Sequence, residues 1–136
     1  MAAHTRAVTP GTFVFLLSDF LPPAPREMWL AALEHRWDLV PVVIQDPTWE
    51  QSFPDVSGVV VPLRDPRTRR VVPVRLTKKE ARARRAANEA RTHEVFETFR
   101  LLYIDPILVT SSERGAVLEP FLVWTSLRRT RRVIGA

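Results

Sequence analysis

Short apolar runs alternate with amphipathic stretches along this chain. The run at 11–18 is uncharged and rich in aromatic and β-branched residues, and a second apolar run covers 39–44. Continuous apolar runs of this length are typical of parallel strands that are buried on both faces. The stretch between them, 26–36, has apolar residues at helical spacing, which predicts a crossover helix between strands at 11–18 and 38–44. Its expected apolar face holds Trp29, Leu30, Leu33 and Trp37.

Prolines mark the next elements. Pro41 lacks a backbone donor, so it favours an edge position or a bulge for the strand at 38–44. The apolar runs 59–63 and 70–74 flank an Asp65-Pro66 pair. Two such runs around a turn dipeptide predict a β-hairpin.

The second half of the chain predicts two helices around one strand. Thr77 and Glu80 have the spacing of a capping box, which predicts that a helix begins there and continues to about 103. A strand is expected at 105–110 and a last helix at 116–131. The first helix should bury Val95, Phe96, Phe99, Leu102 and Tyr103, and the second should direct Val117, Phe121, Trp124 and Leu127 inward.

The element order predicts an α/β fold: a Rossmann-like parallel sheet of about three strands with flanking helices and an inserted β-hairpin. We expect one domain over 11–132 and a flexible tail over 1–10. Ligands of open α/β sheets bind at the carboxyl ends of the strands. The expected contact surface at these ends consists of Ser18, Asp19, Asp46, Thr110 and Ser111. Trp49, in an irregular loop, either anchors a partner or packs under its own loop.

Composition narrows the class of protein. The chain has 136 residues and no cysteine, which excludes disulfides, thiolate metal sites and cysteine nucleophiles. No apolar run is long enough for a membrane span, and the first ten residues do not have the pattern of a signal peptide. We therefore expect a cytoplasmic protein with no membrane partner.

Charge is distributed unevenly. Residues 1–68 carry five basic and eight acidic side chains, whereas 69–136 carry fifteen and seven. Clustered cations favour nucleic acid, which makes a nucleic-acid-binding α/β domain the alternative function. Eighteen of the twenty basic residues are arginine, and arginine bias also follows from a GC-rich genome, so nucleic acid is the less favoured partner. The residues for this alternative are Arg82, Arg84, Arg85, Arg91, Arg128, Arg129, Arg131 and Arg132.

Candidate catalytic chemistry is scarce. The three histidines are scattered and have no metal-ligand spacing, and the four glycines form no nucleotide-binding loop. No nucleophile, base and orienting group are placed together. We therefore expect no enzyme activity.

Five features in order carry a family resemblance. The strings FLLSDF, LAALEHR and DLVPVVIQDP come first, and the Asp-Pro hairpin, the long helix, a strand that ends in Thr and an Arg-rich terminal helix follow. This order resembles the C-terminal half of the domain-of-unknown-function family fifty-eight over about 11–132. Proteins of that family are von Willebrand factor A-like and are often encoded beside MoxR-type AAA+ ATPases. The resemblance implies a non-enzymatic interaction module for assembly or chaperone-type work with such an ATPase.

The resemblance also implies a metal position. A complete von Willebrand A domain holds a divalent cation at its strand ends, and Asp19 matches one of the ligands. The Asp-x-Ser-x-Ser loop of such a site is missing, and one carboxylate binds Mg²⁺ weakly. We expect no cofactor unless a missing N-terminal half supplies the remaining Mg²⁺ ligands.

In the parent fold another strand would pair with the one at 11–18, so this chain is expected to leave an apolar strand edge bare. Bare edges pair with other chains or aggregate. Either the chain is a fragment of a longer protein, or a partner supplies the neighbouring strand. We expect a homodimer that pairs through Phe13, Val14, Phe15, Leu16 and Leu17.

Overall fold

The computed structural model describes residues 9–65 and 67–134, with the helical backbone alone over 131–134. The chain divides into two units, the first formed by the residues up to Gln45 and from His93 onward, the second by Asp46–Thr92. The elements, in order, are β1 (Phe13–Ser18), α1 (Arg26–Glu34), β2 (Asp38–Ile44), β3 (Val59–Arg64), β4 (Val71–Leu76), α2 (Lys78–Leu101), β5 (Ile107–Val109) and α3 (Arg114–Ile134).

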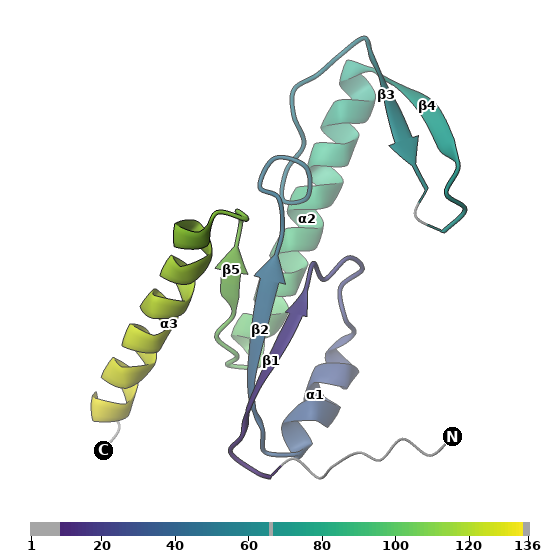
Figure 1. Ribbon diagram of the computed structural model, residues 1–136. Helices are drawn as coiled ribbons and strands as arrows, with labels where there is room; N and C mark the ends of the chain where they lie inside the picture. The colour runs from purple at the N-terminus through teal and green to yellow at the C-terminus, as the bar shows by residue number, and fades with distance from the viewer. Residues whose placement is uncertain (1–8, 66, 135–136) are drawn as a thin grey trace. The chain divides into compact units, whose positions relative to one another are not determined.

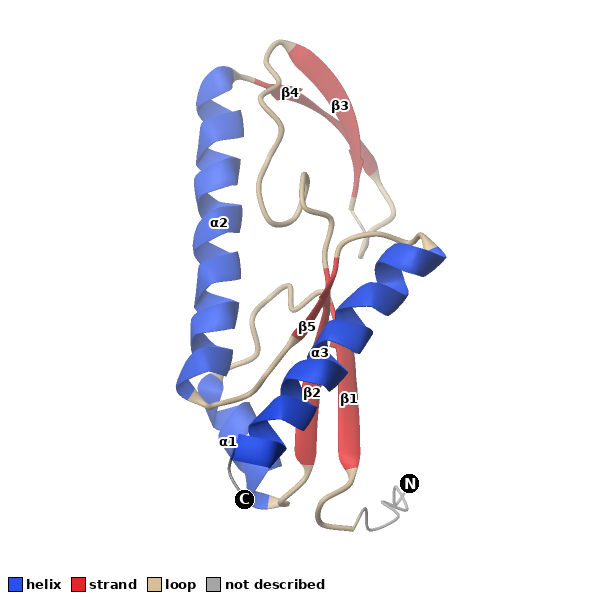
Figure 2. Ribbon diagram, turned by 90° about the vertical axis from the view of Figure 1, so that its left-hand side faces the viewer, coloured by secondary structure: helices blue, strands red, loops and turns tan. Residues whose placement is uncertain are grey.

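The first unit is built on a three-stranded parallel sheet in the order β1-β2-β5. Phe13 lies opposite Asp38 in the register, and Val42 lies opposite Ile107. Figures 1 and 2 show α3 on one face of this sheet, and α1 with the C-terminal part of α2 on the other. The predicted α/β class, a parallel sheet of about three strands with flanking helices and an inserted hairpin, is confirmed.

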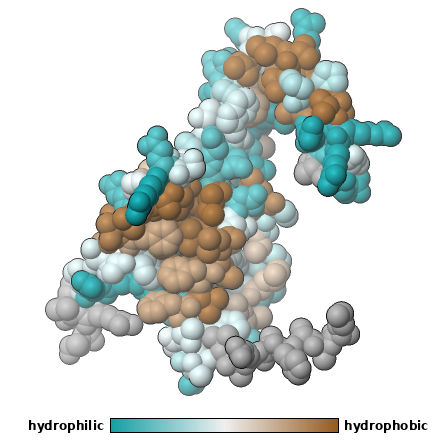
Figure 3. Space-filling view, in the orientation of Figure 1, coloured by the Kyte–Doolittle hydropathy of each residue, from teal (hydrophilic) through white to brown (hydrophobic). Residues whose placement is uncertain are grey.

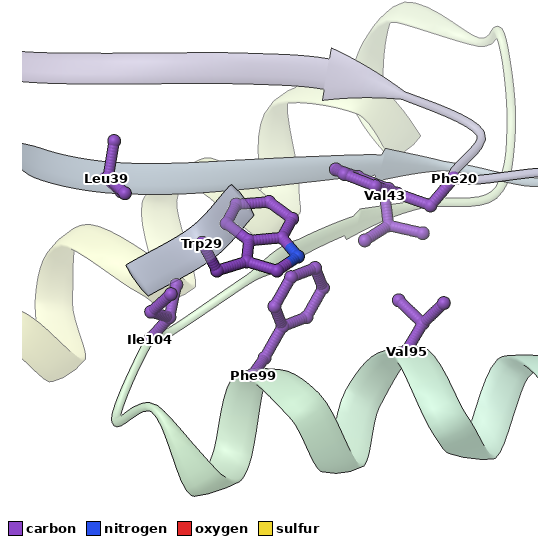
Figure 4. Close-up of a cluster of buried hydrophobic side chains, with 7 residues drawn as sticks. All are labelled: Phe20, Trp29, Leu39, Val43, Val95, Phe99 and Ile104. Atoms are coloured by element: carbon purple, nitrogen blue, oxygen red, sulfur yellow. The ribbon is translucent and has the colours of Figure 1, made fainter. Parts of the chain in front are cut away.

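An aromatic cluster fills the α1 and α2 face of this sheet. Trp29 of α1 and Phe99 of α2 meet edge to face, with ring centroids 5.1 Å apart and an interplanar angle of 88°. Phe20, from the loop after β1, contacts both rings. Figure 4 shows these rings between the helices and the sheet, together with Leu39, Val43, Val95 and Ile104.

A second cluster fills the opposite face. Side chains of β2 and β5 pack there against the α3 stripe of Val117, Phe121 and Trp124. Because successive strand residues point to opposite faces, β2 contributes Val40 and Val42 to this cluster and Leu39 and Val43 to the other. Burial on both faces explains why apolar and polar residues do not alternate in the second apolar run.

The second unit contains the antiparallel hairpin β3–β4, the loop before it and the N-terminal part of α2. The predicted capping box is present: Thr77 Oγ1 accepts a hydrogen bond from Glu80 N at 3.2 Å, and Glu80 Oε2 accepts one from Thr77 N at 2.8 Å. Leu76, Ala81 and Phe53 form the small core of this unit. The hairpin prediction is confirmed, although Pro66 of its turn lies outside the described residues.

Pro41 differs from its prediction, because it lies in the central strand, without a bulge in either register. Asp38 N donates to Thr12 O, and Gln45 N donates to Val109 O, so odd-numbered amides of β2 point toward β5. The described pairs between β2 and β5 begin at Val42. The backbone donor that Pro41 lacks would therefore point to the segment before β5, where the two strands are not yet paired. The proline thus removes no hydrogen bond from the β2–β5 ladder.

Three predicted core residues are exposed. Tyr103 is 95% exposed because α2 ends at Leu101 and Tyr103 adopts a left-handed backbone with φ 55°. Leu30 is 43% exposed because the short helix α1 buries its other side, which carries Trp29. Leu127 is 58% exposed and borders a groove beside β5, while Arg128 continues the inward row after Trp124.

The predicted tail and domain limits stay predictions. Residues 1–8 of the tail lie outside the described residues.

Candidate functional site

The free edge of β1 presents backbone hydrogen-bonding groups. The described strands pair β1 only with β2. Thr12 O accepts from Asp38 N at 2.9 Å, so the backbone groups of even-numbered residues of β1 point toward β2. The backbone groups of Phe13, Phe15 and Leu17 therefore point away from the sheet. β1 contains neither proline nor charge that would block another strand.

The side chains of the same three residues form an apolar surface. Phe13 is 47% exposed, Phe15 44% and Leu17 65%. The register with β2 directs them to the α3 face, where Phe13 contacts Trp124 at 6.2 Å between ring centroids and Phe15 contacts Phe121 at 6.4 Å.

Helix α3 extends this surface. Its exposed residues Leu118 and Leu122 neighbour the inward stripe that covers the sheet. Figure 3 shows the resulting brown patch over this face of the first unit. We call it the β1 patch, and its residues are Phe13, Phe15, Leu17, Leu118 and Leu122.

Arg128 joins α3 to the sheet beside this patch. Its guanidinium donates to Asp38 Oδ1 at 2.6 Å. The same group lies 4.7 Å from the ring centroid of Trp124 and 5.5 Å from that of Phe13. Cation–π contacts of this kind contribute about 0.5–2 kcal/mol. Arg128, a candidate for nucleic-acid binding in the sequence, is therefore held in an intramolecular cluster.

The predicted strand-end residues of the first unit are engaged in local hydrogen bonds. Ser18 Oγ accepts from Phe20 N at 2.9 Å, and Asp19 Oδ1 accepts from Leu21 N at 3.0 Å. Ser111 Oγ accepts from Glu113 N at 3.1 Å, and Thr110 is exposed. These contacts order the loops after β1 and β5.

Gln45 belongs to the same strand ends and was missed by the sequence reasoning. Its side chain is 2% exposed, and its amide donates to Asp19 O at 2.6 Å. Gln45 Oε1 is buried and has no hydrogen-bond partner among the described residues. The signal available in the sequence was an amide side chain directly after an apolar run.

Asp19, the one candidate metal ligand, has no further ligands grouped with it in the part of the chain that the structure describes. Within residues 9–65 and 67–134, no three His, Asp or Glu side chains are grouped so that they could hold a metal ion.

Asp46 and Trp49 lie in the second unit and order a loop there. Asp46 Oδ1 accepts from Thr48 N at 2.8 Å and from Trp49 N at 2.9 Å. Trp49 is 50% exposed, and its ring meets Phe53 edge to face at 5.5 Å. Both alternatives for Trp49, contact with a partner and packing within its own loop, remain predictions, because about half of the side chain is exposed and the ring also packs on Phe53.

The arginines of α2 are only partly available to a ligand. Arg85 Nε donates to Phe53 O at 2.9 Å, and Arg91 donates to Asn88 Oδ1 at 2.6 Å. Arg84 lies over the Phe53 ring at 5.9 Å. Arg82 and Arg129 are exposed, whereas the side chains of Arg131 and Arg132 lie outside the described part of the chain.

The α3 side of the β1 patch was also missed. The spacing of Leu118 and Leu122, four residues apart, could have shown a second apolar row beside the inward stripe. The sequence cannot tell which of two neighbouring rows faces the sheet, because that depends on how the helix docks.

No described helix is both long and apolar enough to cross a membrane. Neither a curated protein nor a solved structure gives a match to this chain. A family model does match: the proteins of unknown function DUF58, over residues 2–95. This match covers more than half of the sequence and agrees with the resemblance that its motifs carry. The chain belongs to the DUF58 family.

Proposed function

We propose that this chain is a non-enzymatic protein-interaction module that binds its partner by strand addition along the free edge of β1. The observation that carries the proposal is the coincidence of two features in Phe13, Phe15 and Leu17. Their backbone groups point away from the sheet, and their side chains are 44–65% exposed. An added strand would gain main-chain hydrogen bonds from the edge and apolar contacts from the β1 patch.

A second copy of the chain is the partner that we propose first. Two β1 strands can pair antiparallel about a two-fold axis without bringing like charges together within the strands, since β1 is uncharged. Gly11 N donates to Arg36 O at 2.8 Å, which places the backbone of Arg36 beside the start of β1. Asp19 follows the end of β1, so antiparallel pairing would bring Asp19 of each copy toward the region of Arg36 in the other.

Light scattering after size exclusion tests this proposal. We expect a dimer for the natural chain and a monomer for Leu17→Lys, because a lysine in the patch opposes pairing. Leu101→Lys is the matched control, since Leu101 is 55% exposed on α2 and lies outside the β1 patch. A natural chain that stays monomeric at high concentration would refute self-pairing, and would leave a different strand donor, such as another segment of a longer protein.

The family resemblance supports a further partner, a MoxR-type AAA+ ATPase, in assembly or chaperone-type work. Co-precipitation with such an ATPase, with and without Leu17→Lys, tests whether this partner uses the same edge. Loss of capture in Leu17→Lys and retention in Leu101→Lys would support strand addition to the ATPase. Equal capture of both variants would place the ATPase elsewhere on the chain.

A further inference from the structure

The β3–β4 hairpin has a second exposed surface, unrelated to the β1 edge. Side chains of an antiparallel pair alternate between two faces, and opposite residues share a face. One face packs partly on the core of the second unit through Leu76, Val61 and Val74. All six residues of the other face are exposed. We call it the Pro-Arg face, and its opposed pairs are Val60 with Arg75, Pro62 with Pro73, and Arg64 with Val71.

The two prolines protect the hairpin edges from strand addition. Asp65 N donates to Arg70 O at 2.9 Å, and bonded pairs alternate along an antiparallel ladder. Pro62 and Pro73 therefore form a non-bonded pair, in which the amide nitrogens point outward along the two edges. Because proline has no N–H, each edge lacks a donor at its centre. A ligand of this hairpin must therefore dock on a face.

Charge indicates what the Pro-Arg face can accept. Residues 59–76 hold five arginines and one aspartate, a net charge of +4. The aspartate, Asp65, is used within the turn, where it accepts from Arg67 N at 2.8 Å and from Thr68 Oγ1 at 2.9 Å. Among the described residues neither Arg64 nor Arg75 forms an ion pair.

The two free arginines flank an apolar centre. Val60 is 56% exposed and Val71 is 53% exposed, and the proline pair lies between them. Arg64 and Arg75 occupy opposite corners of the face, four residues apart along the ladder and one strand apart, so their Cα atoms are separated by about 14 Å. A complementary ligand needs apolar side chains in its middle and a negative charge toward each end.

We propose that the Pro-Arg face docks an acidic amphipathic segment of a partner protein. On a helix, which has about 3.6 residues per turn and rises about 1.5 Å per residue, carboxylates about eleven residues apart lie on one side, about 16 Å apart, and would reach both arginines. The apolar side chains between them would cover the two valines and the proline pair. The binding mode is an amphipathic helix laid on an apolar surface with charges at its rim.

The composition of the face favours protein over the other anionic macromolecules. Interfacial membrane segments combine basic residues with tryptophan, phenylalanine or leucine, whereas the Pro-Arg face contains none of these three, and residues 59–76 contain no aromatic residue. Single-stranded nucleic acid binds through aromatic stacking platforms, which are equally missing from this segment. Phosphates would satisfy the arginines but would leave the valines and prolines uncovered.

Fluorescence anisotropy with a labelled synthetic peptide tests the proposal on the full chain. The probe is a helical peptide with a leucine stripe and, on the same side, two glutamates about eleven residues apart, and the control peptide carries lysine at both glutamate positions. We expect the acidic peptide to bind and the lysine peptide not to bind. The paired variant Arg64→Glu with Arg75→Glu should weaken binding about tenfold or more. The pair Lys79→Glu with Arg82→Glu makes the same charge change on exposed positions of α2 and should bind as the natural chain does.

Three results would overturn the proposal. The first is no binding of the acidic peptide, and the second is equal binding of that peptide to the hairpin variant (Arg64→Glu with Arg75→Glu) and the α2 variant (Lys79→Glu with Arg82→Glu). The third is tighter binding of vesicles with anionic headgroups, or of duplex DNA, than of the peptide, which would assign the face to lipid or nucleic acid. Leu17→Lys distinguishes this site from the β1 edge, since it should abolish self-pairing and leave peptide binding unchanged.

Discussion

The two sheets of this chain differ at their edges. β1 has a free edge without proline or charge, and the side chains beside that edge are apolar. The hairpin β3–β4 has a proline in each strand, Pro62 and Pro73, so that neither edge offers a continuous row of donors. Its exposed face instead combines valine, proline and arginine. The first sheet therefore presents an unblocked edge, whereas the second has interrupted edges and presents an exposed face.

The difference teaches that exposure of apolar residues does not by itself define a binding mode. Phe13 and Val71 are exposed to similar extents, at 47% and 53%. The direction of the neighbouring backbone groups separates the two cases, because a strand edge contributes hydrogen bonds that a face does not.

The largest effect is expected from proline substitutions at neighbouring positions of β1. Leu16 N points toward β2, so Leu16→Pro should lower the free energy of unfolding by about 3 kcal/mol. Leu17 N points to the free edge, so Leu17→Pro should change it by less than about 1 kcal/mol while preventing self-pairing. Urea denaturation and light scattering measure the two quantities. Equal losses of stability would show that both amides are bonded within the fold and that the edge is not free.

The next effect compares arginines of the two units. Arg128→Met removes the ion pair with Asp38 and the contacts with two aromatic rings, and should lower the free energy of unfolding by about 1–2 kcal/mol. Arg75→Met should change it by less than about 0.5 kcal/mol, because Arg75 is exposed on the hairpin. Thermal and urea unfolding measure both variants. A larger loss for Arg75→Met would mean that the Pro-Arg face is covered within the chain.

Replacing the two hairpin prolines should change stability less and should promote self-association, because each hairpin edge regains a backbone N–H donor. Pro62→Val with Pro73→Val returns an outward donor to each edge and should alter the free energy of unfolding by less than about 1 kcal/mol. The variant should form oligomers even when Leu17→Lys blocks the β1 edge. Pro47→Val, in an exposed loop, is the control for proline removal. Light scattering that detects only monomers would show that the prolines do not protect the edges.

The smallest effect is the response of the hairpin turn to acid. Hydrogen bonds from Arg67 N, the Thr68 hydroxyl and Thr68 N lower the pKa of Asp65 below its ordinary value of 3.8. A lowered carboxyl pKa stabilises the fold above the ordinary pKa, and this stabilisation is lost as the pH falls through the lowered value. The amide resonances of Arg67 and Thr68 should therefore shift below pH 3.8.

Asp65→Asn is the control for this titration, because the amide does not titrate. The Thr77–Glu80 capping box provides an independent reference in the same unit, since a hydrogen bond from Thr77 N lowers the pKa of Glu80 below 4.5. Turn resonances of Arg67 and Thr68 that shift only at or above pH 3.8 would contradict the lowered pKa of Asp65.

Local interactions explain why much of the fold could be predicted. The capping box involves residues three apart, and the hairpin depends on a turn between two apolar runs. Strand β2 has its predicted bounds, since an apolar run buried on both faces has no other place in an α/β sheet. The strand-end residues were identified by the same logic, and whether they contact a partner stays a prediction.

The sequence alone determined which segments form strands and helices, the parallel class of the sheet, and the apolar and uncharged character of β1. Only the tertiary structure decided which side of each element is covered. Leu127 and Arg128 are neighbours on α3, and the docking of that helix turns the arginine toward the sheet and the leucine toward a groove. Pro41 is tolerated in the central strand only because β5 is short. Burial and strand pairing depend on contacts between residues far apart in the chain, and periodicity within one segment does not encode them.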